Sequence, residues 1–453
     1  MSYSEKLHSL IPGGSHTYSK GDDQFPDNAP EILTRGKGST VWGANDDIYL
    51  DYGMGLRSVS IGYADETINA KVIESINLGN NLSRPSHLEL QAAEKFVELI
   101  PSAEMVKFAK NGSNVTTAAI KLSRGYTGKS KILRCRQHPF FSFDNWFIGS
   151  TEMNKGVPNK YRNDTLLFDF NNATQVERII EESGFDVACI ILEPAADTCP
   201  SFGNETETCC GLRQCNRAYS SHAKKNFLTK LRGICDKYGI VLIFDEMITG
   251  FRWDIGGAQS FYGVNPDLST FGKAMANGFS IAALCGKKAL MSLGSTDVSG
   301  RERLFLLSST HGAEMTGLAA FLATVSAIEQ RNVIEHLWTY GSKFVEMFNQ
   351  ISIGEKMDKY IFLKGPVVNP VYFCLDFNGN NCFALRTLFN KELIKAGVLM
   401  PWISFSLSHG PKELYQTGEA LQKAMRACRS ALNNDSVNGS LRTIQRPVFR
   451  KYN

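Results

Sequence analysis

Lys273 and Asp245 are the two residues whose types and spacing point most directly to chemistry. Asp245 ends the apolar run 239–245, and Lys273 follows it by 28 positions. Pyridoxal phosphate chemistry needs an amine that binds the cofactor aldehyde as a Schiff base. It also needs an acid that keeps the pyridine nitrogen protonated, so that the ring can accept electrons. Either residue alone would more often be a surface lysine or a helix cap, but together they predict a pyridoxal-phosphate site with both as catalytic residues.

The turn Asn111-Gly-Ser-Asn114 is a candidate phosphate site. Apolar residues recur at helical spacing directly after it, so the turn leads into the first turn of a helix. Backbone N–H groups there lack intrahelical partners, and the helix dipole adds positive potential, which favours anions. Gly112 permits close approach and Ser113 can donate its hydroxyl. Such a turn alone is more often an ordinary cap, but the presence of Lys273 favours phosphate binding.

The elements that must position these residues are predicted to form an α/β domain. Between about residues 100 and 290, short β-rich runs alternate with helical patterns, which is typical of a mainly parallel sheet covered by helices. The runs 187–193 and 239–245 are continuously apolar and end in a carboxylate, as strands buried on both faces do. Ligands bind at the carboxyl ends of such strands, so Glu193 and Asp245 are expected at that edge.

A smaller α+β domain is predicted from both ends of the chain. Short strands are expected at residues 32–34 and 40–42, a buried helix at 317–328, a strand at 371–376, and helices at 383–395 and 411–432. The predicted division is residues 1–50 as the N-terminal part of the small domain, 51–315 as the large cofactor-binding domain, and 316–453 as the C-terminal small domain.

Composition excludes several classes of protein. The net charge of +4 comes from basic and acidic residues spread along the 453-residue chain, so we expect no nucleic-acid partner. No apolar run reaches the roughly 18 residues of a membrane span, and no secretory signal is visible, so a cytoplasmic protein is expected. We expect no metal. Four cysteines in a polar segment match no usual zinc spacing, and the insertion could be an ordinary surface loop: Cys199, Cys209, Cys210 and Cys215.

The chain resembles the class III pyridoxal-phosphate aminotransferases, and within them glutamate-1-semialdehyde 2,1-aminomutase and its aminotransferase relatives. The strongest part of the likeness is Ile243-Phe-Asp-Glu-Met-Ile-Thr-Gly-Phe-Arg252, followed by Gly256-Gly-Ala-Gln259 and by Asn265-Pro-Asp-Leu268, which leads to Lys273. Further motifs are Ile11-Pro-Gly-Gly14, Tyr49-Leu-Asp-Tyr52 and Leu122-Ser-Arg-Gly-Tyr-Thr-Gly128. The likeness covers nearly the whole chain.

The resemblance implies PLP fold type I, like aspartate aminotransferase, and a homodimer with shared active sites. Lys273 would hold the cofactor and move the proton, and Asp245 would pair with the pyridinium. Thr310 would reach the phosphate of the neighbouring subunit, Glu193 matches the acid of a family strand end, and Asp197 or Thr198 could reach the phenolic oxygen. The phosphate would lie on Gly112, Ser113 and Asn114, although the family usually has threonine and glutamate at the last two positions.

The ring-stacking position is less defined, because His138-Pro-Phe-Phe-Ser142 replaces the family's aromatic-His-Gly. Phe140 is the first choice for the ring that stacks on the cofactor and Phe141 the second, with core packing as the ordinary alternative. Lys20 stands where the mutase has an arginine for the substrate carboxylate. Arg57 stands where the mutase has a small residue, and it could bind a carboxylate or phosphate bidentately.

These departures favour an aminotransferase that moves an amino group from an amino donor to a keto or aldehyde acceptor by ping-pong chemistry. The segment from Phe141 to Gly156 is also shorter than the lid that a mutase needs to retain its intermediate. Two alternatives stay open at the level of sequence. One is the internal aminomutase, and the other is a binding protein that keeps the fold without catalysis, which the intact Lys273 and Asp245 oppose.

Overall fold

The structure of the protein is a computed structural model, which describes residues 1–201, 214–215 and 226–452. The chain forms two compact units. One comprises Met1–Asp65 and Glu335–Arg450, and the other comprises Glu66–Ile334 with the end of the chain from Lys451. The sequence-based division at residues 50 and 315 stays a prediction.

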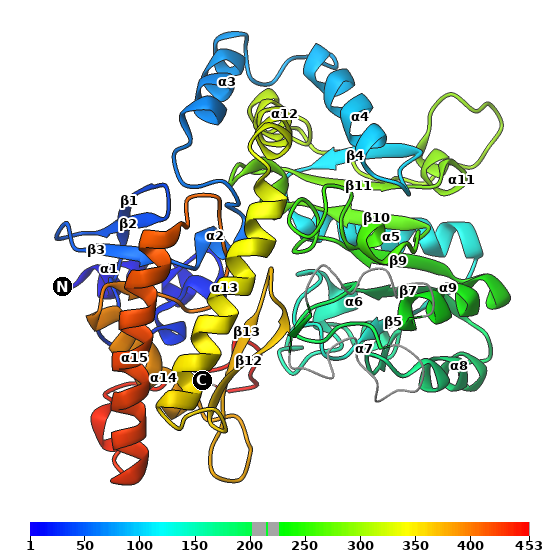
Figure 1. Ribbon diagram of the computed structural model, residues 1–453. Helices are drawn as coiled ribbons and strands as arrows, with labels where there is room; N and C mark the ends of the chain where they lie inside the picture. Colours follow the sequence, from blue (N-terminus) through cyan, green and yellow to red (C-terminus); the bar gives the residue numbers. More distant parts are fainter. Residues whose placement is uncertain (202–213, 216–225, 453) are drawn as a thin grey trace. The chain divides into compact units, whose positions relative to one another are not determined.

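The larger unit is built on a seven-stranded sheet with the order β4-β11-β10-β9-β7-β5-β6 (Figure 1). From β10 to β6 every neighbouring pair is parallel, whereas β11 runs antiparallel to both β10 and β4. The carboxyl ends of all strands except β11 therefore share one edge. The strand bounds are Met105–Ala109 (β4), Lys131–Cys135 (β5), Thr165–Phe168 (β6), Val187–Leu192 (β7), Val241–Asp245 (β9), Leu268–Phe271 (β10) and Ala282–Gly286 (β11).

The central strands are buried because their sequences are apolar on both faces. Every residue of β7, β9, β10 and β11 is buried, as expected for strands with helices on both sides. The strands predicted at residues 187–193 and 239–245 are confirmed as β7 and β9. The mainly parallel α/β architecture of fold type I is confirmed as well.

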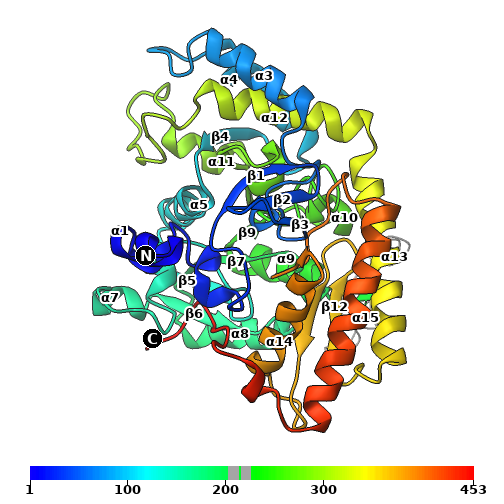
Figure 2. The ribbon, with the colours of Figure 1, turned by 90° about the vertical axis from the view of Figure 1, so that its left-hand side faces the viewer.

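The helices of this unit begin at caps that the sequence supplies. Ser86 and Glu89 form a capping box at the start of α4, Asn111 caps α5, and Glu314 caps α12. The helix predicted at residues 317–328 is α12, and most of its side chains are buried. It packs against α3 and α4 and lies beside them in both views (Figures 1 and 2). The longer helices are Glu66–Asn77 (α3), His87–Leu99 (α4), Gly112–Thr127 (α5), Ala173–Glu182 (α8), Phe227–Tyr238 (α9) and Met315–Gln330 (α12), and the shorter ones are Asn145–Ile148 (α6), Asn159–Arg162 (α7), Ala258–Tyr262 (α10) and Lys288–Met291 (α11).

The smaller unit combines short strands with long helices. One sheet has the order β1-β2-β3-β14, and β12 pairs antiparallel with β13. The Tyr52 hydroxyl joins strand and helices in the core, because it lies 2.8 Å from the Tyr340 hydroxyl and 2.7 Å from that of Thr417. The bounds are Tyr3–Leu10 (α1), Leu33–Lys37 (β1), Thr40–Gly43 (β2), Ile48–Asp51 (β3), Met54–Arg57 (α2), Val333–Gly354 (α13), Ile361–Pro366 (β12), Val371–Cys374 (β13), Phe383–Lys395 (α14), Val398–Leu399 (β14) and Pro411–Asn433 (α15).

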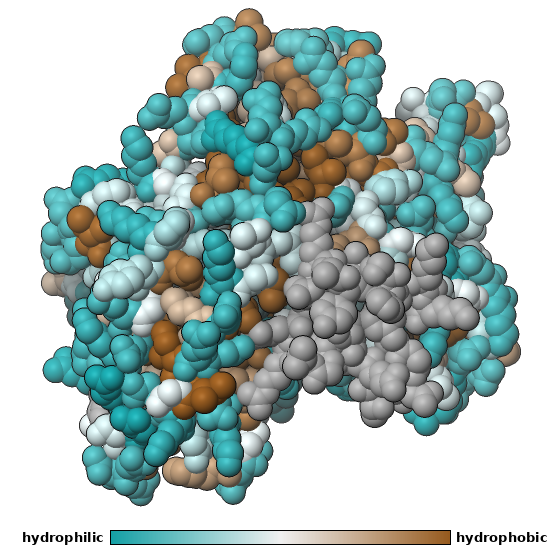
Figure 3. Space-filling model, viewed as in Figure 1, coloured by the Kyte–Doolittle hydropathy of each residue, from teal (hydrophilic) through white to brown (hydrophobic). Residues whose placement is uncertain are grey.

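The surface is mostly hydrophilic on the face in Figure 3, where hydrophobic residues gather in two places, one over the region of α12, β4 and β11 and one at the lower left over the smaller unit. Among the described residues, none of the helices combines the length and the apolar character that crossing a membrane would require.

Candidate active site

Lys273 and Asp245 follow neighbouring parallel strands. In the register of β9 and β10, Thr270 lies opposite Asp245, so the chain reaches Lys273 three residues beyond that pairing. Lys273 has φ +46°, a left-handed conformation that residues with a side chain seldom adopt. Such strain persists where the surrounding structure enforces it, and it occurs often at functional sites. The structure therefore brings together the two residues that the sequence predicted.

The Asp245 carboxyl group is held at the end of β9 and is only 3% exposed. Its Oδ1 accepts hydrogen bonds from the Met247 backbone N–H at 3.1 Å and from the Thr270 hydroxyl at 3.2 Å. Burial raises the pKa of Asp245 to about 6, while these hydrogen bonds and the charge of Lys273 oppose that rise. A cation held against this carboxyl group would favour its ionised form.

The predicted phosphate turn lies at the N-terminus of α5, a helix of 16 residues. The Asn111 side chain accepts a hydrogen bond from the Asn114 N–H at 3.0 Å, so Asn111 is the helix cap. The first N–H groups of a helix have no intrahelical acceptor, and one of those in α5 is thus satisfied by the cap. Ser113 is buried, and its Oγ accepts from the Phe143 N–H at 3.2 Å. A serine hydroxyl that accepts this N–H can still donate its own proton to a ligand.

Met247 joins this turn to the ends of β9 and β10. A Cβ atom on Gly112 would lie 3.1 Å from the Met247 sulfur, and one on Gly272 would lie 2.7 Å from it. Each glycine thus allows the thioether to pass close to the backbone. The phosphate turn and the residue before Lys273 are therefore packed against one side chain, and the backbone N–H of the same residue donates to Asp245.

The two candidate stacking rings differ in their surroundings. Phe141 is 2% exposed and packs against His138, Trp146 and Phe147, which is the environment of a core residue. Phe140 is 49% exposed and touches Phe147 with its edge. Phe140 is the more exposed of the two rings, and the geometry favours it over Phe141 as the ring that stacks on a ligand.

His138 connects this segment to Glu193 at the end of β7. Its Nδ1 accepts the Glu193 backbone N–H at 2.9 Å, so the ring is neutral and its other nitrogen carries the proton. Burial, with the nearby Arg134 charge, lowers the pKa of His138 to about 3. Farther along, the Thr198 hydroxyl donates to Asp197 at 3.3 Å. The substitution of the family's aromatic-His-Gly thus leaves a histidine that orders the sheet edge.

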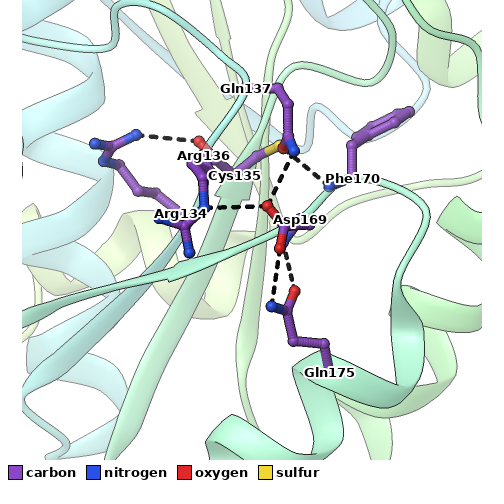
Figure 4. A network of polar contacts seen from close by, with 7 residues as sticks. All are labelled: Arg134, Cys135, Arg136, Gln137, Asp169, Phe170 and Gln175. Atoms are coloured by element: carbon purple, nitrogen blue, oxygen red, sulfur yellow. Dashed lines mark hydrogen bonds and ion pairs between the residues drawn. The ribbon is translucent and has the colours of Figure 1, made fainter.

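A polar network holds the chain just before His138 (Figure 4). Asp169 Oδ1 accepts from the Arg136 guanidinium and from the Gln137 amide, both at 3.0 Å, and its Oδ2 accepts from the Gln175 amide at 2.9 Å. These contacts, led by the Gln175 hydrogen bond, lower the pKa of Asp169 despite partial burial. Gln137 also accepts from the Phe170 N–H at 3.0 Å. The ends of β5 and β6 are thereby fixed together.

Thr310 is exposed on the segment between β11 and α12. Nearby on the same segment, Glu314 forms an ion pair with Lys110, the residue that precedes the phosphate turn. That pair lowers the pKa of Glu314 against the effect of burial. The segment is therefore tied to the turn, while Thr310 itself is exposed.

The two substrate candidates, Arg57 and Lys20, belong to the smaller unit. Arg57 is half-buried at the end of α2, and Lys20 is exposed. Asp51, a buried carboxylate at the end of β3, feels the charge of Lys20 and accepts hydrogen bonds at the start of the turn that Arg57 ends. Burial raises its pKa, while hydrogen bonds from Tyr63, Gly53 and Met54, and the charge of Lys20, counteract part of that rise.

Comparison with known proteins identifies the family. The model of the class-III aminotransferases matches residues 23–198 and 219–366. The chain belongs to the class-III aminotransferase family.

A 3-aminobutyryl-CoA aminotransferase of Cloacimonas acidaminovorans is 31% identical over 95% of this chain and 98% of that protein. A glutamate-1-semialdehyde 2,1-aminomutase of Persephonella marina is 34% identical over 58% and 59% of the two chains. Among solved structures, the FumI protein of a Sphingopyxis species has a TM-score of 0.80 at 23% identity, with 97% of each chain covered.

As a class-III aminotransferase, the protein is an enzyme whose cofactor is pyridoxal 5'-phosphate. The described residues fit that cofactor. A buried carboxyl group beside a lysine suits a protonated pyridine ring, and a glycine-containing helix N-terminus suits a phosphate. When bound, pyridoxal phosphate supplies an electrophilic aldehyde and an electron-accepting ring.

Sequence reasoning about this aminotransferase missed three contributors: Met247, His138 as a hydrogen-bond acceptor, and Asp51. The available signal for Met247 was a pair of glycines, Gly112 in the phosphate turn and Gly272 directly before Lys273. Both leave room for a side chain that packs between them. The acid in Tyr49-Leu-Asp51-Tyr52 was a second signal, since it also ends a strand. For the cysteine-rich insertion, Cys209 and Cys210 lie outside the described residues, whereas Cys199 is a buried free thiol.

Proposed function

We propose that this aminotransferase moves an amino group from an amino donor to a keto or aldehyde acceptor in two half-reactions, with Lys273 and Asp245 as its catalytic residues. The observation that carries the proposal is the pairing of Thr270 with Asp245, which places the lysine and the buried acid at adjacent strand ends. The 31% identical relative, itself named an aminotransferase, supports transfer between two molecules over internal rearrangement.

Each candidate residue would act through a defined group. Lys273 Nζ would bind the cofactor aldehyde at rest and, once the substrate amine displaces it, would carry the proton from the substrate carbon. The Asp245 carboxylate would keep the pyridine nitrogen protonated. The phosphate would be bound by the first turn of α5, Phe140 would stack on the ring, and Glu193 would fix the end of β7 beside it. The residues proposed for the turn are Gly112, Ser113 and Asn114.

Arg57 and Lys20 are proposed to bind the substrate. Both carry a positive charge. Lys20 acts on Asp51 through its charge, and Arg57 ends the turn whose first residue, Met54, donates to Asp51. A guanidinium can bind a carboxylate or phosphate through two parallel hydrogen bonds, whereas an ammonium acts as a point charge. Arg57 would therefore provide the more selective contact.

We also propose that the enzyme is a cytoplasmic homodimer. A homodimer is supported by the exposed position of Thr310, which would reach the phosphate site of a second subunit. A cytoplasmic enzyme is supported by the cysteines whose side chains the structure describes, since all eight are free thiols.

Covalent trapping tests the proposal directly. Purified protein is loaded with pyridoxal phosphate, reduced with borohydride and digested, and the modified peptide is identified by mass spectrometry. We expect the label on Lys273, and we expect Lys273→Ala to lose the label and on the order of 10²- to 10⁴-fold in turnover. Lys288→Ala, which removes an exposed lysine of the same unit, is the matched control. A label on another lysine would contradict the assignment.

The internal mutase is separated from the aminotransferase by the number of substrates. An aminotransferase needs an amino donor and a separate acceptor, so glutamate-1-semialdehyde supplied alone should not be converted to 5-aminolevulinate. Sustained conversion of that single compound would show that the enzyme is a mutase.

A further inference from the structure

The segment Met54–Arg57 is a left-handed helical turn. The φ angles are +42° at Met54, +58° at Gly55, +64° at Leu56 and +65° at Arg57. The Arg57 N–H donates to the Gly53 carbonyl at 3.1 Å, and the Ser58 N–H to that of Met54 at 3.0 Å. L-residues avoid this conformation, because their Cβ atoms crowd the following carbonyl oxygen. Three of the four residues carry side chains, so the turn is strained.

The Asp51 carboxylate holds the beginning of this turn. Its Oδ1 accepts the Gly53 N–H at 2.7 Å, and its Oδ2 accepts the Met54 N–H at 3.0 Å and the Tyr63 hydroxyl at 2.7 Å. Asp51 is 3% exposed, so these hydrogen bonds form away from competing water. Both oxygens are used, which fixes the direction of the backbone at the first residue of the turn.

Other contacts reinforce the same conformation. The Trp402 indole donates to the Gly53 carbonyl at 2.8 Å, and the Ser58 hydroxyl donates to that of Gly55 at 2.7 Å. Met54 is fully buried and anchors the turn in the core. These contacts are not needed merely to reverse the direction of the chain, because right-handed turns reverse it without strain. What the left-handed turn specifies is the place and direction from which Arg57 leaves the backbone.

We propose that Asp51 is a positioning residue, and that the left-handed turn it stabilises presents Arg57 to an anionic group, carboxylate or phosphate, of the amino substrate. The inference rests on the proposed function, because it assigns the substrate class of the same reaction. Lys20, whose charge acts on Asp51, would add positive potential for that anion. Backbone strain that several contacts enforce is the feature that links this segment to function.

The kinetic test compares pairs of amino donors that differ in one anionic group, in the half-reaction of the holoenzyme. L-Glutamate and L-glutamine differ only in a carboxylate and an amide, and O-phospho-L-serine and L-serine form the phosphate pair. For Arg57→Leu, we expect KM for the anionic member to rise about tenfold to a hundredfold relative to its neutral partner, which is the range for a lost hydrogen bond to a charged group. Whichever pair shows the effect identifies the anion. Arg35→Leu removes an exposed arginine of the same unit and is the control.

The role of Asp51 is tested by rescue. Asp51→Asn removes one of the two acceptors that hold the turn, so it should raise KM for the same anionic donor while kcat stays unchanged. Adding Leu56→Gly should lower KM again, because glycine adopts the left-handed conformation without strain. A merely structural role for Asp51 would change both donors of a pair equally and would not respond to glycine. Tyr63→Phe, which removes one hydrogen bond, replaces Asp51→Asn if that variant does not fold.

A binding measurement separates failure of this inference from failure of the proposed function. The same holoenzyme variants are titrated with glutarate and with inorganic phosphate by calorimetry, which requires no turnover. Binding by the wild type that is lost in Arg57→Leu and weakened in Asp51→Asn supports the inference, even if no donor reacts. Equal anion binding by all variants overturns it, and the proposed aminotransferase would stand if the donors still react.

Discussion

Asp245 lies at the end of β9, and Lys273 follows the neighbouring strand β10. The protonation state of the Asp245 carboxyl group is therefore the central property of the site. Burial raises the pKa of this carboxyl group to about 6 in the protein without cofactor. Above that pH the group is ionised and can stabilise a protonated pyridine nitrogen. Below it the group is neutral, and the attraction is lost.

Cofactor affinity should therefore depend on pH through Asp245. We expect Asp245→Asn to weaken pyridoxal phosphate binding by roughly 2 kcal/mol or more above pH 7, because it removes one partner of a buried charge pair. The difference between wild type and variant should shrink as the pH falls below about 6, since the wild-type carboxylate then becomes neutral. Affinities of the cofactor-free proteins, measured from pH 5 to 8, provide the check. Phosphate ionisation affects both proteins equally, so a constant difference over this range would contradict the assignment.

The same pKa has a consequence for the stability of the cofactor-free protein. The folded state holds the Asp245 proton more tightly than the unfolded chain does, because its pKa is raised from 3.8 to about 6. This contribution is fully present below the unfolded value and is lost as the pH rises through about 6. Asp245→Asn should lack that part of the pH dependence in a denaturant titration.

The segment between β9 and α10 is packed against the residues that lead to Lys273. A Cβ atom on Gly250 would lie 2.4 Å from the Phe271 ring and 2.9 Å from the Glu246 carbonyl. Phe271 ends β10 and is fully buried, so it has little room to move. The glycine is therefore required by close approach and not by an unusual φ angle.

Replacing this glycine should disturb both stability and the site. We expect Gly250→Ala to lower the free energy of unfolding by about 1–3 kcal/mol, the usual cost of overpacking a core. Gly233→Ala in α9 is the matched control, because a Cβ atom there meets nothing within 4 Å. It should raise the free energy of unfolding by about 0.5–1 kcal/mol, as alanine does in a helix interior. Urea titrations measure both, and a Gly250→Ala variant as stable as the wild type would show that Phe271 relaxes freely.

The elements that the sequence predicts well are those whose signals are local. The apolar runs of β7 and β9 and the helix after Asn111 are confirmed, and α14 spans the predicted residues 383–395. The site is predictable only where it lies on such elements, as Lys273 and Asp245 do. The left-handed turn at Met54–Arg57 is not, because it exists through contacts with residues distant in the sequence.

The same distinction explains the choice between two adjacent phenylalanines. Sequence places Phe140 and Phe141 on one segment and cannot tell which enters the core, since each is equally apolar. The structure separates them through packing, with Phe141 covered by Trp146 and Phe147. Packing of this kind depends on the neighbours of a whole segment, and a single-residue preference does not contain it.

At the scale of the whole molecule, the exposed apolar side chains of the larger unit are concentrated around α3 and α4. These helices bury their other faces against α12 (Figure 2). The exposed fractions are Ile73 58%, Ile76 52%, Leu78 57%, Leu82 51% and Leu90 63%. Exposed apolar side chains gathered in one region are typical of a protein interface, and a homodimer would cover them.

The proposed dimer should dissociate when this surface is charged. We expect Ile76→Glu with Leu90→Glu to convert the dimer to monomers at micromolar concentration in sedimentation experiments, and to abolish activity together with assembly. Ile353→Glu, at a residue of the smaller unit that is 64% exposed, should leave the dimer intact. A monomeric wild type that retains full turnover would exclude shared sites.

Complementation then tests whether the sites are shared. Lys273→Ala disables the site of its own chain, whereas Thr310→Ala would weaken the phosphate contact in the neighbouring one. When the two variants are mixed and allowed to exchange subunits, half of the sites in each mixed dimer regain both residues. Activity of the mixture should therefore exceed the sum of the separate variants, and it should not do so when the interface carries Ile76→Glu and Leu90→Glu. If the activity of the mixture only equals the sum of the separate activities, Thr310 acts within its own chain. Its exposed position on the segment before α12 would then have another cause.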